Sequence, residues 1–140
     1  MNIINSVTVS IIVAMNNRPQ IGYISPLIPG GNDLEKAIEF YEKQLGFTTI
    51  HKEGDPIRMV IVKRDSAEIF LVKSDYHDLA KEISLRLQVK GIDQLYQELQ
   101  AKGGEMIHPN GKLETKPWGP KEFTIIDLAG ICLTFYEFPQ

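Results

Sequence analysis

The order of strand-like and helix-like segments repeats once along this chain of 140 residues. Residues 21–75 contain one strand-like segment, an amphipathic helix and then three short strand-like runs, and residues 82–138 contain the same order again. Such a repeat predicts an α+β domain built from two copies of one βαβββ module, neither of which buries its sheet alone. It argues against a parallel dinucleotide-binding sheet, because one strand–helix pair followed by a meander does not build one.

The first module has a strong helix signal over residues 33–45. The apolar residues there recur at the spacing that places them on one face of a helix. Asn32 or Asp33 is suited to cap the N-terminus of this helix, and Gly46 is suited to end it. The strands of this module are predicted over residues 21–28, 47–51, 57–63 and 67–73, and the first is interrupted at Ser25 and Pro26.

The second module begins with residues 84–89, where apolar and polar residues alternate as in a half-buried strand. A helix is predicted over residues 91–102. Three more strands are predicted over residues 105–108, 122–127 and 131–138, with Asn110-Gly111 as the strongest hairpin signal of the chain. The segment between the modules, around His77, is predicted to be a loop.

Charge and cysteine content argue against several kinds of partner. The chain has 15 Lys and Arg against 18 Asp and Glu and no basic block, so no nucleic acid partner is expected. Cys132 is the single cysteine, which excludes an intrachain disulfide and a multi-cysteine zinc site. Because Cys132 lies in an alternating apolar run, we interpret it as a strand residue rather than a reactive thiol.

Residues 7–15 form an apolar stretch near the N-terminus. No Lys or Arg precedes it, and the following Asn16-Asn17-Arg18 does not have the small residues of a signal-peptide cleavage site. The stretch is also too short to span a bilayer. We therefore expect a cytoplasmic protein without a membrane partner, in which residues 1–20 are an extension and residues 21–140 form a single domain.

Two segments give the repeat a family resemblance. Residues 33–47 read DLEKAIEFYEKQLGF, and residues 127–131 read DLAGI. Together with the paired modules, they resemble the vicinal oxygen chelate superfamily, which includes glyoxalase I, extradiol dioxygenases, fosfomycin-modifying enzymes and bleomycin-resistance proteins. The resemblance covers about residues 21–138. It implies a curved mixed sheet that bears a ligand cleft, in a protein that forms a homodimer.

A narrower resemblance lies in residues 116–123, which read KPWGPKEF. This segment is similar to the PWGxxEF segment of bleomycin-resistance proteins and related binding members. The similarity implies the metal-free, drug-binding branch of the superfamily and, with it, a role in antibiotic resistance.

The resemblance also implies where the enzymes of the superfamily hold a divalent metal. The four positions fall at Ser25 or Pro26, Phe70, Ser84 and Thr134, none of which has an imidazole or a carboxylate. Glu68 lies two residues from the second position, but one carboxylate does not make a metal site. The three histidines of the chain lie in separate segments without metal-binding spacing. We therefore expect no metal and no other cofactor.

Period-two alternation predicts which side chains share a face with these positions. Arg86 on such a face must either pair with Glu68 or contact a carboxylate, phosphate or carbonyl group of a ligand. Trp118, the only tryptophan, either stacks on a flat ring of a ligand or packs as a lid, whereas Phe123 is better suited to the core. The predicted ligand-binding residues are Glu68, Phe70, Ser84, Arg86, Gln88, Trp118, Phe123, Thr134 and Tyr136.

Three functions remain open from the sequence. The first is a homodimer that binds and sequesters a small aromatic or drug-like molecule without a metal. The second is a lyase or isomerase of the glyoxalase or dioxygenase kind that acts on a small metabolite. The third is an interaction domain whose cleft is filled by its own side chains. The missing metal ligands and the absence of a marked nucleophile–base pair favour the binding protein over the enzyme.

Overall fold

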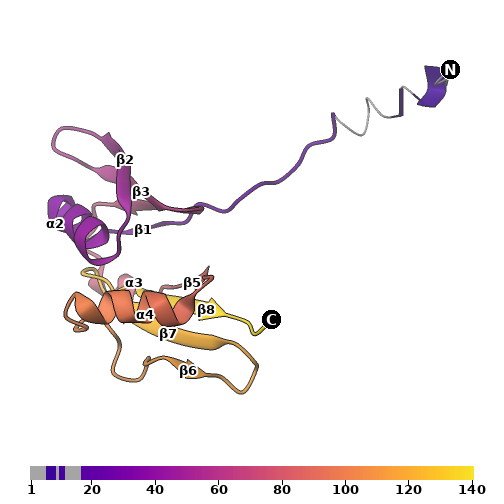
Figure 1. Cartoon of the computed structure of the whole chain (residues 1–140). Coiled ribbons are helices and arrows are strands. Elements are labelled where there is room, and N and C mark those ends of the chain that lie inside the picture. The colour runs from indigo at the N-terminus through magenta and orange to yellow at the C-terminus, as the bar shows by residue number, and fades with distance from the viewer. Residues whose placement is uncertain (1–5, 9, 12–16) are drawn as a thin grey trace.

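Two four-stranded mixed sheets form the framework of the computed structural model, which describes residues 6–8, 10–11 and 17–140 (Figure 1). In each sheet the first strand lies at an edge, parallel to the last strand of its module, and the other neighbours are antiparallel. The first sheet has the order β1 (Leu27–Pro29), β4 (Ala67–Val72), β3 (Met59–Arg64) and β2 (Thr48–Glu53). The second has the order β5 (Ser84–Gln88), β8 (Cys132–Glu137), β7 (Lys121–Ile126) and β6 (Glu114–Thr115). The predicted repeat of one βαβββ module is therefore confirmed.

One helical segment in each module packs on one face of that module's sheet. In the first module, α2 (Leu34–Glu39) continues into the π-helical turn η1 (Phe40–Gln44). Asp33 caps α2 by accepting a hydrogen bond from the backbone N–H of Lys36 at 3.3 Å, and Gly46, at φ 72°, follows the last turn. In the second module the corresponding helix is α4 (Ile92–Ala101).

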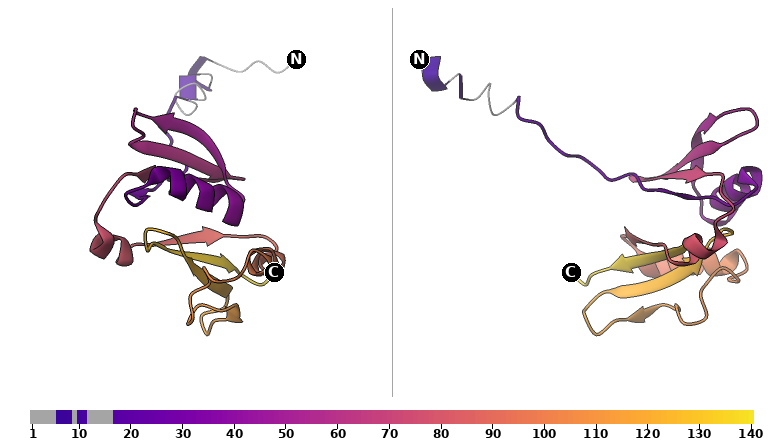
Figure 2. Two further views of the ribbon diagram at one scale, coloured as in Figure 1. Left: turned by 90° about the vertical axis from the view of Figure 1, so that its left-hand side faces the viewer. Right: turned by 180° about the vertical axis from the view of Figure 1, so that it is seen from behind.

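The core lies on the helix side of both sheets. Alternate residues of the strands, such as Val60, Leu71 and Leu133, are buried there against the helices. Figure 2 shows α2 lying between the two sheets. Among the residues that the structure describes, no helix covers the opposite faces of the sheets, which carry Phe70 in β4 and Arg86 in β5.

A buried hydrogen bond joins the two modules. The Tyr41 hydroxyl donates to Oδ2 of Asp127 at 2.7 Å, and both residues are buried. Oδ1 of Asp127 accepts from the backbone N–H groups of Ala129 and Ile131 at 3.0 and 2.9 Å. The two segments that carry the family resemblance thus contact each other and hold the modules together.

Three local predictions were wrong. Residues 21–26 form no strand, because Pro26 has no N–H to donate and pairing begins only at Leu27. Residues 105–108 contribute only the isolated bridge between Ile107 and Ile125, since Pro109 follows them and the chain turns away. The turn at Asn110-Gly111 is present, but β6 begins only at residue 114, so no two-residue hairpin forms.

The structure adds one helix and leaves one prediction outside its range. The segment between the modules, predicted to be a loop, contains the short helix α3 (His77–Lys81). Most of the apolar stretch at residues 7–15 lies outside the described residues. Within the described ranges, no helix is both long and apolar enough to cross a membrane.

Glu137 caps α4 from β8. Gly91 precedes α4 at φ 83° and has no side chain to cap it, but the Glu137 carboxylate accepts from the backbone N–H groups of Gly91 and Ile92, both at 3.1 Å. We expect Glu137→Ala to lower the free energy of unfolding by about 1 kcal/mol, and Glu137→Gln to cost less because it keeps one acceptor. Urea unfolding followed by circular dichroism measures both, with the exposed Glu105→Ala as the control. Equal stability of Glu137→Ala and Glu105→Ala would contradict this role.

Candidate functional site

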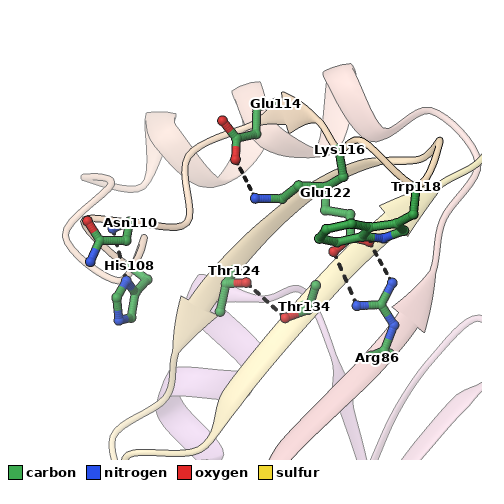
Figure 3. Close-up of polar contacts among 9 residues, drawn as sticks. All are labelled: Arg86, His108, Asn110, Glu114, Lys116, Trp118, Glu122, Thr124 and Thr134. Atoms are coloured by element: carbon green, nitrogen blue, oxygen red, sulfur yellow. Dashed lines mark hydrogen bonds and ion pairs between the residues drawn. The ribbon is translucent and has the colours of Figure 1, made fainter.

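The uncovered face of the second sheet brings several predicted residues together. Register places Arg86 of β5 opposite Thr134 of β8, and Gln88 opposite Tyr136. On the other side of β8, Glu122 of β7 lies opposite Tyr136. Because β5 and β7 flank the same strand, their outward side chains meet above it (Figure 3). The sequence predicted this grouping for all of these residues except Glu122.

Arg86 and Glu122 form a bidentate ion pair across β8. Nη1 of Arg86 lies 3.1 Å from Oε1 of Glu122, and Nη2 lies 2.7 Å from Oε2. The hydrogen bonds from Arg86 lower the pKa of the Glu122 carboxyl, and the same bonds raise the pKa of Arg86. Glu68, which the sequence offered as one alternative partner of Arg86, lies in β4 of the other sheet, and Arg86 pairs with Glu122 instead.

Trp118 extends over this ion pair from the loop before β7. Its Nε1–H donates to Oε2 of Glu122 at 3.0 Å, and its side chain is 62% exposed. The loop is held by two backbone hydrogen bonds, from Lys116 to Pro120 and from Gly119 to Lys116. The indole is therefore fixed at its polar edge while much of its surface is open to a ligand.

Each member of the ion pair lies near an aromatic ring, Arg86 near Tyr136 and Glu122 near Trp118. The Cζ atom of Arg86 lies 4.7 Å from the ring centroid of Tyr136. The ammonium group of Lys116 lies 5.9 Å from the ring centroid of Trp118 and forms an ion pair with Glu114. Such cation–π contacts help to hold the rings of Tyr136 and Trp118 in place. The face therefore presents the Arg86–Glu122 ion pair next to two aromatic side chains.

A small cavity of about 320 Å³ continues this face toward the other end of the sheet. Its lining includes Ser84, Thr134 and Cys132 together with His108. The hydroxyls of Thr134 and Thr124 hydrogen-bond to each other at 2.8 Å, and Nδ1 of His108 accepts from the backbone N–H of Asn110. The cavity lining therefore combines hydroxyl groups with two charged residues, Lys81 and Glu82.

The positions at which the resemblance places metal ligands do not fit a metal. Phe70 has no donor atom, and the Thr134 hydroxyl is engaged by Thr124. Ser25 and Pro26 lie in the coil before β1. Across residues 6–8, 10–11 and 17–140, no three His, Cys, Asp or Glu side chains gather in a way that could hold a metal ion.

Two other predicted residues, Phe70 and Glu68, lie apart from this group within one chain. Both are on β4, on the uncovered face of the first sheet, where register aligns Phe70 with Leu27 and Ile61. This row of side chains is apolar, whereas Glu68 lies opposite Lys63 of β3 on the same face. Phe123 was wrongly included among the ligand contacts, because it points to the opposite face of β7 and is buried in the core against Tyr96.

A groove of about 630 Å³ lies on the helix side of the sheets. It lies between the modules, with an apolar lining that includes Phe47 and Phe135. Arg64 and Glu98, which also line it, form a bidentate ion pair at 2.8 and 3.1 Å. Of the predicted ligand-binding residues, only Gln88 contributes to this groove.

Comparisons with known proteins agree with the fold. Residues 27–135 match the family model of the Glyoxalase/Bleomycin resistance protein/Dioxygenase superfamily. The Bleomycin resistance protein of Geobacillus stearothermophilus is 31% identical over 126 residues, covering 80% of this chain and 93% of that protein. A protein of the same description from Staphylococcus aureus has the same identity and coverage.

Among solved structures, a bleomycin-binding protein complexed with bleomycin is similar, with a TM-score of 0.72 and 20% identity over 85% of this chain and all of that chain. The bleomycin-binding protein from Streptomyces verticillus complexed with copper(II)-bleomycin has a TM-score of 0.65 and 18% identity, covering 86% of this chain and 100% of that chain. At these identities the similarity establishes the fold.

Proposed function

Because the chain belongs to the glyoxalase/bleomycin resistance protein/dioxygenase superfamily, we propose that it binds a small aromatic, drug-like molecule without a metal and sequesters it. The observation that carries the proposal is Trp118, an exposed indole fixed by Glu122 over a sheet face that also carries Arg86 and Tyr136. A ring held at its edge by a hydrogen bond loses little freedom when a flat ligand stacks on its face. Bleomycin is the first ligand to test, since the relatives named above bind it or are named for resistance to it.

The experiment is a fluorescence titration with metal-free bleomycin. Trp118 is the only tryptophan in the chain, so the emission reports on this face alone. We expect saturable quenching with a Kd in the micromolar range or tighter. N-acetyltryptophanamide at the same absorbance corrects for light absorbed by the ligand. Absence of saturable quenching up to millimolar bleomycin would remove that ligand from consideration.

We further propose that the protein acts as a homodimer whose ligand cleft lies between two copies. Within one chain, the apolar face that carries Phe70 and the polar face that carries Arg86 belong to different sheets. A second copy that places its Phe70 face opposite the Trp118 face would supply the missing wall of a cleft. This arrangement would also cover the exposed side chain of Leu27.

Leu27 provides a test of this dimer. It is 61% exposed and lies beside Phe70 on β1, so Leu27→Glu would place a charge in the proposed interface with little effect on the folded chain. We expect the wild-type protein to sediment as a dimer and Leu27→Glu to weaken dimerisation by at least about tenfold. Leu79→Glu, at a similarly exposed position on α3, is the control. A monomeric wild-type protein at millimolar concentration would contradict the dimer.

We propose that residues 21–140 form the ligand-binding domain and that residues 1–20 are an extension of it. The match to the family model, which begins at residue 27, supports this division. We also propose a cytoplasmic location. The single cysteine is compatible with a reducing compartment, where structural disulfides are rare.

A further inference from the structure

Glu122 is an unusual residue for a ligand-binding face, because it is a carboxylate that is only 4% exposed. All of its partners are on that same face. Its two oxygens accept two hydrogen bonds from Arg86 and one from Trp118. One carboxylate thus fixes both the guanidinium and the indole that the proposed ligand would meet.

The guanidinium keeps donors that Glu122 does not use. An arginine has five N–H groups, and the ion pair occupies two of them. Within the described residues Arg86 makes no other hydrogen bond, and its side chain is 49% exposed. Arg86 can therefore donate to a ligand while its positive charge is balanced by Glu122.

The positive charge nearest the indole, on Lys116, is also balanced. Lys116, which lies over the indole of Trp118, forms an ion pair with Glu114. Beside the indole, an anionic ligand would therefore have to compete with the buried carboxylate of Glu122 for Arg86, whereas Lys81 lines the cavity at the other end of the sheet. An uncharged carbonyl or ring nitrogen could accept an unused N–H of Arg86 without displacing that carboxylate.

We propose that Glu122 determines the ligand specificity of this face: by neutralising Arg86 and orienting Trp118, it makes the face accept aromatic molecules that carry a hydrogen-bond acceptor and no negative charge, and reject anionic ones. This inference rests on the proposed function and names the chemical class of its ligand. It treats Glu122 as a positioning residue that acts through its two partners.

Quenching of Trp118 fluorescence by iodide and by caesium tests the charge balance without a ligand. The ratio of the iodide quenching constant to the caesium quenching constant reports the local charge around the indole, and it rises when that charge becomes more positive. In the wild-type protein we expect a ratio within about twofold of that of N-acetyltryptophanamide, and in Glu122→Gln a rise in the ratio of about threefold or more, because Arg86 loses its counter-charge. A wild-type ratio far from that of the free indole, or no change in Glu122→Gln, would overturn the proposal.

Another bidentate arginine–glutamate pair, between Arg64 and Glu98, supplies a matched control. Glu98→Gln removes the same charge from the same kind of pair, with Arg64, on the helix side of the sheets. We expect its quenching ratio to equal that of the wild-type protein. An equal rise in Glu98→Gln and Glu122→Gln would show that net charge alone is measured, and would overturn the proposal.

Selectivity is measured with two ligands that share one ring, quinoline-4-carboxamide and quinoline-4-carboxylate. By calorimetry we expect the wild-type protein to prefer the amide by about tenfold or more, and Glu122→Gln to reduce this preference by about tenfold. The double variant Arg86→Gln/Glu122→Gln, which has no unpaired charge, is expected to regain the preference. If the preference for the amide stayed reduced in the double variant, the reduction would reflect altered structure and not charge. That result would overturn the proposal.

The outcomes separate this inference from the proposed function. If the wild-type protein binds the amide but the preference is the same in Glu122→Gln, the specificity role of Glu122 is wrong and aromatic binding stands. If the wild-type protein binds neither quinoline, the inference is overturned, while saturable quenching by bleomycin would still support the proposed function.

Discussion

Replacing Asp127 by alanine is expected to lower the free energy of unfolding by about 3 kcal/mol. The substitution would leave the Tyr41 hydroxyl and the backbone N–H groups of Ala129 and Ile131 without their acceptor in a buried site. Each buried donor without a partner costs about 1–3 kcal/mol, and partial relaxation of the chain reduces the total. Urea unfolding of the variant and the wild-type protein at pH 7 measures the difference.

Two further variants separate the contributions to this site. Asp127→Asn keeps an oxygen for the backbone N–H groups and places an amide beside the Tyr41 hydroxyl, which can then accept. We expect it to cost less than about 1 kcal/mol, because it also removes a buried charge. Tyr41→Phe removes one hydrogen bond and is expected to cost about 1–2 kcal/mol. A loss in Asp127→Ala no greater than that in Asp127→Asn would contradict the role given to these hydrogen bonds.

The same site gives stability a pH dependence. Burial raises the pKa of the Asp127 carboxyl above its usual value, although hydrogen bonds from Tyr41 and from the backbone act in the opposite direction. Between the usual pKa and the raised one, the folded protein keeps a proton that the unfolded chain has lost. The contribution of Asp127 to the free energy of unfolding is therefore full below this window and falls as pH rises through it. Asp127→Asn should lack this contribution when unfolding curves are compared from pH 3 to pH 7.

The sequence was sufficient for the topology because the signals for it are local. The apolar stripe of α2, its cap at Asp33 and its end at Gly46 all lie within one short segment. Strands that depend on a distant partner were less predictable. Residues 105–108 have a suitable pattern, but they find only the single bridge from Ile107.

The candidate site could be predicted only in part. Alternation identifies the face on which Arg86 lies, but not the neighbour it meets there. That neighbour depends on β5 and β7 lying on either side of β8, and so Glu122 was missed. The available signal in the sequence was the place of Glu122 in residues 116–123, the segment that carries the narrower resemblance. The bond between Tyr41 and Asp127 spans 86 residues, and only the family resemblance marked both segments.

Trp118→Ala is expected to weaken binding of metal-free bleomycin by about 10- to 100-fold, equivalent to about 1.4–2.7 kcal/mol, while the free energy of unfolding changes by less than about 0.5 kcal/mol. The two effects separate because the indole is largely exposed and its one hydrogen bond, to Glu122, lies at the binding face. Calorimetry is the measurement, since the variant has no tryptophan to observe.

Two controls show which part of the Trp118 side chain matters. Tyr76→Ala removes an aromatic ring that is 71% exposed, next to α3 and outside the candidate site, and should bind bleomycin like the wild-type protein. Trp118→Phe keeps a ring but not the N–H that binds Glu122, so its affinity should lie between those of the wild-type protein and Trp118→Ala. If Trp118→Ala binds like the wild-type protein, the indole is not part of the binding face. If Trp118→Phe binds as weakly as Trp118→Ala, the hydrogen bond that orients the ring contributes more to affinity than the area of the ring does.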